Sequence, residues 1–178
     1  MTRFKRWHLK NEMLAANFVS NFIGIVLIKL FLLRTEGSIP EKFLQHPVSN
    51  FMDYVFIPAA FTFVFITTLI YERPIRSYLN AKFYKASVSS ATKHTARQRL
   101  LNEPFVLISL SFSMWLLSAI VYPVVYWALD IGRYWMQSSC FMSLSTGLII
   151  VTVAFFLLEH VLQKQLAPHF FPNGGLYT

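Results

Sequence analysis

The stretch FVLISLSFSMWLLSAIVYPVVYWAL, residues 105–129, runs for 25 positions without a charged side chain. A helix of about 20 apolar residues is long enough to cross the hydrocarbon core of a bilayer. Three further segments, residues 13–33, 52–71 and 138–162, have comparable length and composition, although 13–33 is the weakest because it contains Lys29. The sequence therefore predicts an all-α integral membrane protein with four transmembrane helices.

The composition of the chain argues against a soluble globular domain. Apolar residues make up 55% of the sequence and charged residues only 13%, whereas soluble domains carry about 25% charged residues. The formal net charge of +8 comes from side chains that cluster outside the apolar segments. This placement favours the anionic headgroups of a lipid bilayer over nucleic acid as the partner. A homo-oligomer and a cytoplasmic signalling partner both remain open.

The distribution of Lys and Arg predicts the orientation in the membrane. Four such residues precede residue 13, seven lie in segment 72–103, and one, Lys164, follows residue 162, whereas the two remaining connections together carry three. Cytoplasmic segments of membrane proteins are enriched in Lys and Arg. We therefore expect a multi-pass protein of the inner (plasma) membrane with both termini and segment 72–103 in the cytoplasm.

Polar residues and prolines inside the spans predict how the helices meet. Asn17 and Asn21 lie one turn apart, so they share a helix face that we expect to contact another helix. Pro58 and Pro123 lie within the second and third spans, where neighbouring helices can satisfy the freed carbonyl groups. We expect kinks at both prolines.

Two short motifs recur at the boundaries of the spans. RWHLKNEM (residues 6–13) and RQRLLNEP (97–104) precede the first and third spans, and in each of them basic residues lead into Asn-Glu. YERPIRSYL (71–79) and LEHVLQKQL (158–166) follow the second and fourth spans, and their alignment matches the glutamates and two apolar positions. The chain therefore reads as two parallel two-span repeats.

The repeat divides the chain into two units, residues 1–85 and 86–178. Each unit contains a basic leading segment, two spans and an exit segment. Between the units, Pro74 at an expected helix start and apolar residues at helical spacing predict one amphipathic helix. A polar break at residues 87–95 and a second short helix up to Glu103 complete a predicted cytoplasmic helical hairpin.

A glutamate marks the predicted cytoplasmic end of each span: Glu12, Glu72, Glu103 and Glu159. A carboxylate at such a boundary is costly unless it meets water, a cation or a helix N-terminus. We hypothesise that the four glutamates form a charged ring with three arginines of the leading segments, Arg6, Arg97 and Arg99. The alternative is that all of them are solvated boundary residues.

The sequence contains no arrangement that would support catalysis or cofactor binding. A glycine-rich phosphate loop, a nucleophile elbow and a metal-binding His-Glu-x-x-His helix are all absent. Cys140 is the only cysteine, and the five histidines lie outside the spans or at their edges. We therefore predict neither an enzyme nor a metal or cofactor site.

Several of these stretches resemble a known family. RWHLKNE followed by NFVSNFIG, YERPIRSYL, RQRLLNEPF and FFPNGGL are similar to the N-terminal membrane region of bacterial class III adenylate/guanylate cyclases. In that family, six spans lead through a HAMP linker to a cytoplasmic cyclase domain. The family's last two spans, its linker and its catalytic domain have no counterpart in these 178 residues. The resemblance therefore implies a non-catalytic, receptor-like membrane module.

The sequence and the resemblance together suggest a membrane anchor or sensor module that relays a signal to a cytoplasmic output domain such as a nucleotide cyclase. Movement would pass through the exit segments, and the candidate relay residues are Glu72, Pro74, Ile75, Leu79, Glu159, Leu162 and Leu166. The alternative is a small transporter or lipid-handling protein with an aromatic-lined cavity in its outer half. The candidate lining residues of that cavity are Trp115, Tyr122, Tyr126 and Trp135.

Overall fold

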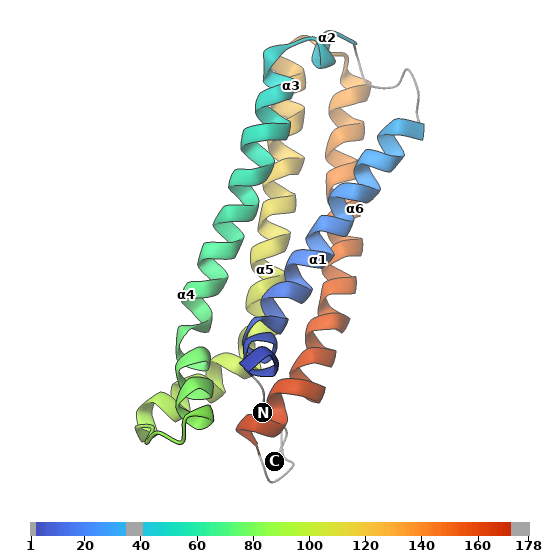
Figure 1. The fold of residues 1–178 in the computed structure, drawn as a ribbon. Coiled ribbons are helices and arrows are strands. Elements are labelled where there is room, and N and C mark those ends of the chain that lie inside the picture. The colour runs from blue at the N-terminus through green and yellow to red at the C-terminus, as the bar shows by residue number, and fades with distance from the viewer. Residues whose placement is uncertain (1–2, 35–40, 172–178) are drawn as a thin grey trace. The chain divides into compact units, whose positions relative to one another are not determined.

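A computed structural model describes residues 3–34 and 41–171, and within these ranges the chain is helical apart from short turns. Figure 1 shows the order of the helices along the chain. The four long helices are α1 (Arg3–Arg34), α4 (Ile57–Phe83), α5 (Ser90–Ala128) and α6 (Arg133–Val161). The described residues contain four helical segments that are long and apolar enough to cross a membrane, which confirms the predicted spans.

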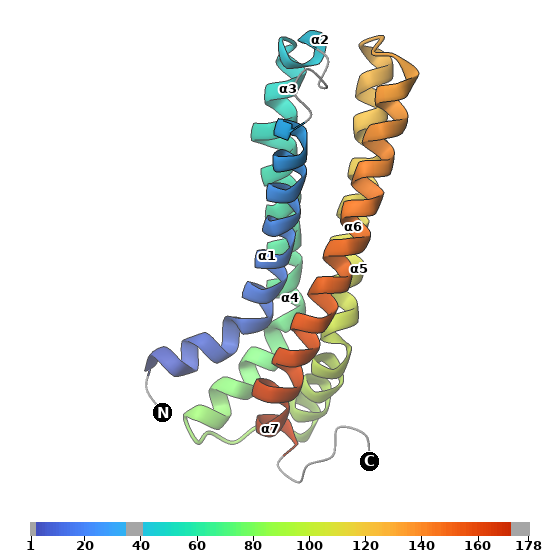
Figure 2. The ribbon, with the colours of Figure 1, turned by 90° about the vertical axis from the view of Figure 1, so that its right-hand side faces the viewer.

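Short helical elements join or extend the long ones. α2 (Glu41–Leu44) and α3 (Pro47–Phe51) lie in the first connection, where the His46 side chain accepts a hydrogen bond from the backbone N–H of Val48 at the start of α3. Two π-helical turns, η1 (Met52–Phe56) and η2 (Leu162–Leu166), continue directly into α4 and α7 (Ala167–Phe170). Figure 2 shows α7 at the end of the α6 segment.

The two π-helical turns share a cause that can be read from the sequence. Proline follows the last residue of each turn by two positions, at Pro58 and Pro168. Proline cannot donate a backbone hydrogen bond, so the helix must rearrange ahead of it. The residue before each proline donates instead to the carbonyl five positions back, Ile57 to Met52 and Ala167 to Leu162.

The predicted hairpin between the repeats is not made of separate short helices, which corrects the sequence-based expectation. α4 runs without a break through Pro74, and α5 extends from Ser90 past Glu103 into its apolar part. Pro74 therefore lies inside a helix rather than at a helix start. Only residues 84–89 form the turn, and Ser89 caps α5 by accepting a hydrogen bond from the backbone N–H of Thr92 at 3.1 Å. The predicted polar break at residues 87–95 thus falls largely within α5.

α4 and α5 end in the same backbone motif. Lys85 and Asp130 have positive φ angles of 54° and 51°. In each case the next residue donates a hydrogen bond to a carbonyl five positions back, Ala86 to Ala81 and Ile131 to Tyr126, both at 2.9 Å. A residue in the left-handed conformation, followed by this hydrogen bond, commonly ends a helix. The residue is usually glycine, but here it is a lysine in one helix and an aspartate in the other.

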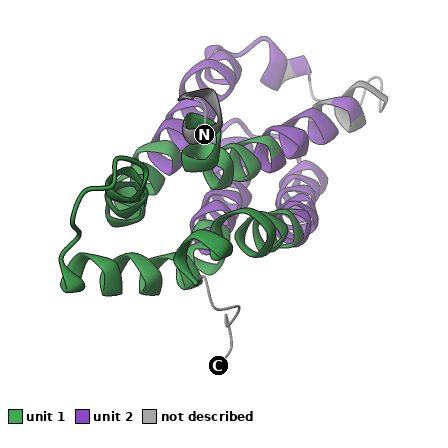
Figure 3. Cartoon of the chain, turned by 60° about the horizontal axis from the view of Figure 1, so that its bottom comes forward, with its two compact units in different colours: residues 1–19, 65–108, 154–178 green, residues 20–64, 109–153 purple. Residues whose placement is uncertain are grey.

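The chain forms two compact units, each assembled from distant parts of the sequence (Figure 3). Unit 1 comprises Met1–Val19, Phe65–Ile108 and Ala154–Thr178, and unit 2 comprises Ser20–Val64 and Ser109–Val153. Each unit contains portions of both halves of the chain, so the two units describe how the chain packs and not how its sequence repeats. The division into repeats at residues 1–85 and 86–178 stays a prediction.

The core of unit 1 is apolar and gathers all the helical segments of that unit. Its buried residues are Leu9, Met13, Ile75, Tyr78, Leu79, Ala96, Leu100, Leu107, Leu158, Val161, Leu162, Leu166 and Phe170. Four of these, Ile75, Leu79, Leu162 and Leu166, are the apolar relay candidates from the sequence. Both exit segments therefore contribute to one core.

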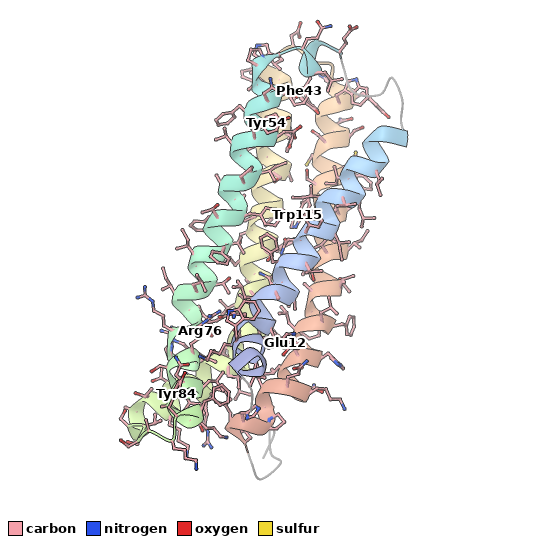
Figure 4. All side chains as sticks on the ribbon, in the orientation of Figure 1. Glu12, Phe43, Tyr54, Arg76, Tyr84 and Trp115 are labelled. Carbon is pink, nitrogen blue, oxygen red and sulfur yellow. The ribbon has the colours of Figure 1, made fainter. Side chains whose placement is uncertain are left out.

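Unit 2 contains two packed regions. The first is a cluster around Phe43, Met52, Tyr126 and Ile131, in which the rings of Phe43 and Tyr126 meet edge to face with centroids 5.0 Å apart. The second surrounds Trp115 of α5, which Figure 4 labels. A Cβ atom at Gly147 would lie 2.7 Å from the Trp115 Cβ, and one at Gly24 would lie 2.8 Å from the Trp115 ring. The two glycines thus leave room for the indole.

Replacing Gly147 with alanine is expected to destabilise the protein by about 1–3 kcal/mol, because the added methyl group meets the Trp115 Cβ, which cannot move without its backbone. Thermal unfolding of the purified protein in detergent measures the loss. Gly132→Ala is the matched control, since no atom lies within 4 Å of the added Cβ. Equal melting temperatures for Gly147→Ala and the unmodified protein would contradict this account of Trp115 packing.

Candidate functional site

A pair of buried carboxyl groups lies in unit 1. Glu72 on α4 and Glu103 on α5 are 2% and 1% exposed, and their side chains lie within hydrogen-bonding reach of each other. The sequence predicted a glutamate at each of these boundaries but did not predict that the two would meet. The solvated alternative is therefore wrong for Glu72 and Glu103.

Arg76 is the cation that faces this pair. Its Nε and Nη2 atoms lie 2.6 Å and 2.5 Å from Glu72 Oε2, one helical turn along α4. Figure 4 labels Arg76 on α4. The ring hypothesis named only arginines of the leading segments as partners of the glutamates, so it did not identify Arg76. A partner at position i+4 on the same helix is available from local geometry alone.

Arg99 and Tyr71 form a reciprocal contact between α5 and α4. The Arg99 Nη1 atom donates to the carbonyl of Tyr71 at 2.9 Å, and the Tyr71 hydroxyl donates to the carbonyl of Arg99 at 3.0 Å. The guanidinium also lies over the Tyr71 ring, 5.2 Å from its centroid. Pro74 has no N–H to donate to the carbonyl of Ile70, which is next to the carbonyl that Arg99 binds. Arg99 therefore joins two helices rather than pairing with a glutamate.

Arg97 binds the end of the second exit segment. Its Nε and Nη2 atoms donate to the carbonyl of Phe170 at 3.1 Å and 2.8 Å, and its guanidinium lies 5.2 Å from the centroid of the Phe171 ring. Lys82, near the end of α4, donates to the carbonyl of His169. Cations thus satisfy carbonyl groups at the end of α7 that no helical N–H can reach.

Glu12 and Glu159, the other two predicted ring members, have separate surroundings. Glu12 Oε2 lies 3.6 Å from His8 Nδ1 on α1. Glu159 is partly exposed and accepts a hydrogen bond from Gln163 at 3.0 Å. The Arg6 side chain lies outside the described residues. The four glutamates therefore form one buried pair and two separate positions, not a continuous ring among the residues described.

The polar face predicted on α1 is confirmed. Asn17 is buried, and Asn21 donates through Nδ2 to Ser111 Oγ at 3.0 Å. Asn21 also accepts a hydrogen bond from Trp115 Nε1 at 3.2 Å. Trp115, the first candidate for an aromatic cavity lining, is therefore held by packing and a hydrogen bond inside unit 2.

Sequence reasoning missed three residues of unit 1: Arg76, Thr68 and Phe170. Arg76 stands four positions after Glu72, and Thr68 stands four positions before it. A helical projection of residues 65–83 would therefore have placed Thr68, Glu72 and Arg76 on one face. Phe170 was noted only as an aligned position, yet it is completely buried against Tyr78, with ring centroids 4.5 Å apart. Its burial depends on contacts with distant segments that no local pattern contains.

The described residues contain no group of three or more His, Cys, Asp or Glu side chains arranged to hold a metal ion. The arrangement in unit 1 is a joint of polar contacts beside the apolar core. The cations Arg76, Arg97, Arg99 and Lys82 bind a carboxyl group and backbone carbonyls, and these contacts connect α4, α5 and α7. No protein-family model, no curated protein and no solved structure matches this chain.

Proposed function

We propose that this chain is a multi-pass membrane module that anchors a cytoplasmic output domain and relays a signal to it, without catalysing a reaction itself. The observation that carries the proposal is the shared core of the exit segments. Ile75 and Leu79 from α4 are buried in the same cluster as Leu162 and Leu166 from η2. A displacement of either exit segment would therefore change the packing of the other.

Helix continuity supports transmission along α4. Within unit 1, the apolar residues from Phe65 onward and the exit segment belong to the same helix, which ends at Phe83. Closely packed cores do not deform smoothly but exchange between discrete arrangements. A change in the membrane-spanning part of α4 would thus reach Leu79 and, through the core, Leu166.

The resemblance to cyclase membrane regions supplies the candidate output, a nucleotide cyclase domain acting in the same chain or as a separate protein. Segment 72–103 carries seven Lys and Arg residues, which supports a cytoplasmic position for the exit segments. A cyclase domain would act on that side of the membrane. The DNA that follows the codon for Thr178 tests this assignment. A HAMP linker or cyclase gene there is expected, and a permease operon would contradict it.

The relay itself can be tested by distance measurement within unit 1. Spin labels at Tyr84→Cys and Lys164→Cys, both exposed, would be placed in a Cys140→Ser background and measured by pulsed electron paramagnetic resonance in nanodiscs. Gly147→Ala, which disturbs Trp115 in unit 2, is expected to shift the distance distribution by about 1–2 Å, the size of helix shifts in signalling proteins. Gly132→Ala should leave it unchanged. Identical distributions for all variants would identify a static anchor.

A further inference from the structure

The Glu72–Glu103 pair has more acceptors than donors. Glu72 Oε1, Glu103 Oε2, the hydroxyl oxygen of Thr68 and Arg76 Nη2 are buried without a hydrogen-bond partner among the described residues. Arg76 Nη2 makes an ion pair with the other oxygen of Glu72, Oε2, so it does not satisfy the two unpartnered carboxyl oxygens. Ionised carboxyl groups can only accept hydrogen bonds. Two ionised carboxyl groups that lie close together therefore cannot hydrogen-bond to each other. They can interact favourably only if a proton or another cation lies between them.

The charge balance gives the same result. Two carboxylates face one guanidinium, that of Arg76, so the ionised pair retains one uncompensated negative charge in a buried position. Burying an unpaired charge is strongly unfavourable. One monovalent cation would neutralise it.

The neighbouring charged groups do not supply that cation. Arg99 on α5 is engaged with Tyr71, whose hydroxyl is bound to the Arg99 carbonyl. On α1, the carboxyl group of Glu12 interacts with His8 and with His160 of α6. Glu159 on α6 is bound by Gln163. Among the described groups that act on Glu103, Arg76 is the cationic one.

The geometry points to a binding site for one exchangeable monovalent cation, H⁺ or Na⁺, formed by Glu72, Glu103 and Thr68. Thr68 is completely buried and stands one helical turn before Glu72, so its hydroxyl lies on the helix face that carries the carboxyl group. It can donate to a carboxylate or act as a third oxygen ligand for Na⁺. This inference is independent of the proposed relay.

Infrared spectroscopy of the full chain in lipid tests the site directly, because a protonated carboxyl group has a C=O band that an ionised one lacks. In sodium-free buffer at about pH 7, where solvated carboxyl groups are ionised, the protein is expected to show this band. Glu72→Gln and Glu103→Gln should each remove it, because Arg76 then neutralises the single remaining carboxylate. Glu12→Gln and Glu159→Gln are matched controls that should retain it.

Adding Na⁺ distinguishes the two cations. Loss of the band with Na⁺ but not with the larger K⁺ identifies a sodium site in which the metal displaces the proton. A band that is insensitive to both salts but disappears at higher pH identifies a proton site. A protein without the band between about pH 5 and about pH 9, or with the same band in both Gln variants, overturns the inference. Should a Gln variant fail to fold, the salt and pH series on the unmodified protein still decides.

Discussion

Replacing Arg76 with alanine is expected to destabilise the protein by about 3–5 kcal/mol, the cost of removing one partner from a buried ion pair. The variant would leave Glu72 and Glu103 buried together without the guanidinium that lies 2.5 Å from Glu72. Thermal unfolding in detergent, followed by helical circular dichroism, measures the effect. Because natural domains are stable by only about 5–15 kcal/mol, this loss is a large part of the total stability, and the melting temperature is expected to fall clearly.

Arg73→Ala provides the control for the loss of a positive charge on α4. Arg73 is exposed and lies three positions from Arg76 on the same helix, so its replacement should change stability by no more than about 0.5 kcal/mol. Adding Glu72→Gln to Arg76→Ala should recover part of the loss, because the double variant no longer buries two carboxylates without a partner. Equal stability of Arg76→Ala and Arg73→Ala would show that Arg76 does not balance the carboxyl pair.

Replacing Phe170 with alanine is expected to cost about 3–5 kcal/mol, the range for removing a buried aromatic ring. Phe170 is completely buried, its ring lies on that of Tyr78, and its carbonyl receives two hydrogen bonds from Arg97. The cavity would open between α4 and α7, where both exit segments meet. Chemical or thermal unfolding in detergent gives the free energy.

Phe156→Ala is the matched control, since this phenylalanine of α6 is 67% exposed in the same unit. Its removal should leave the free energy of unfolding within about 0.5 kcal/mol of the unmodified protein. A similar loss for both variants would mean that Phe170 contributes no more than a surface residue does. The packing of Phe170 would then not hold the two exit segments together.

The membrane spans were predictable because they depend on a property summed over about 20 residues. The uncharged run at residues 105–129 needs no knowledge of its neighbours to be recognised. The same holds for the burial of Ile75, Leu79, Leu162 and Leu166, since helical spacing alone places apolar residues on one face. The shared face of Asn17 and Asn21 followed from the same geometry.

The continuity of α4 and α5 was not predictable from local signals. Pro74 and the polar residues 87–95 are typical of helix boundaries in water, yet α4 continues through Pro74. In a membrane protein, neighbouring groups can bind the carbonyls that a proline frees. Pro74 leaves the carbonyl of Ile70 without its helical donor, and Arg99 binds the adjacent carbonyl, that of Tyr71. The sequence contains both residues but gives no measure of their distance.

The partners of the glutamates were predicted least well. Electrostatic reasoning required a cation for Glu72, but the arginines that it named did not include Arg76, which lies four positions along the same helix. The meeting of Glu72 with Glu103 depends on how two helices approach each other. Such a contact is a tertiary property, and the spacing of 31 positions along the chain does not encode it.

The central claim is that the two exit segments meet in one joint, and chemical cross-linking tests it most directly. Lys82→Cys and His169→Cys would be combined in a Cys140→Ser background, since Lys82 of α4 reaches the carbonyl of His169 in α7. In native membranes, a short bifunctional thiol reagent is expected to link the two cysteines within one chain, whereas neither single-cysteine variant forms that link. Failure to cross-link, although both cysteines react with a monofunctional reagent, would contradict the joint and the relay built on it.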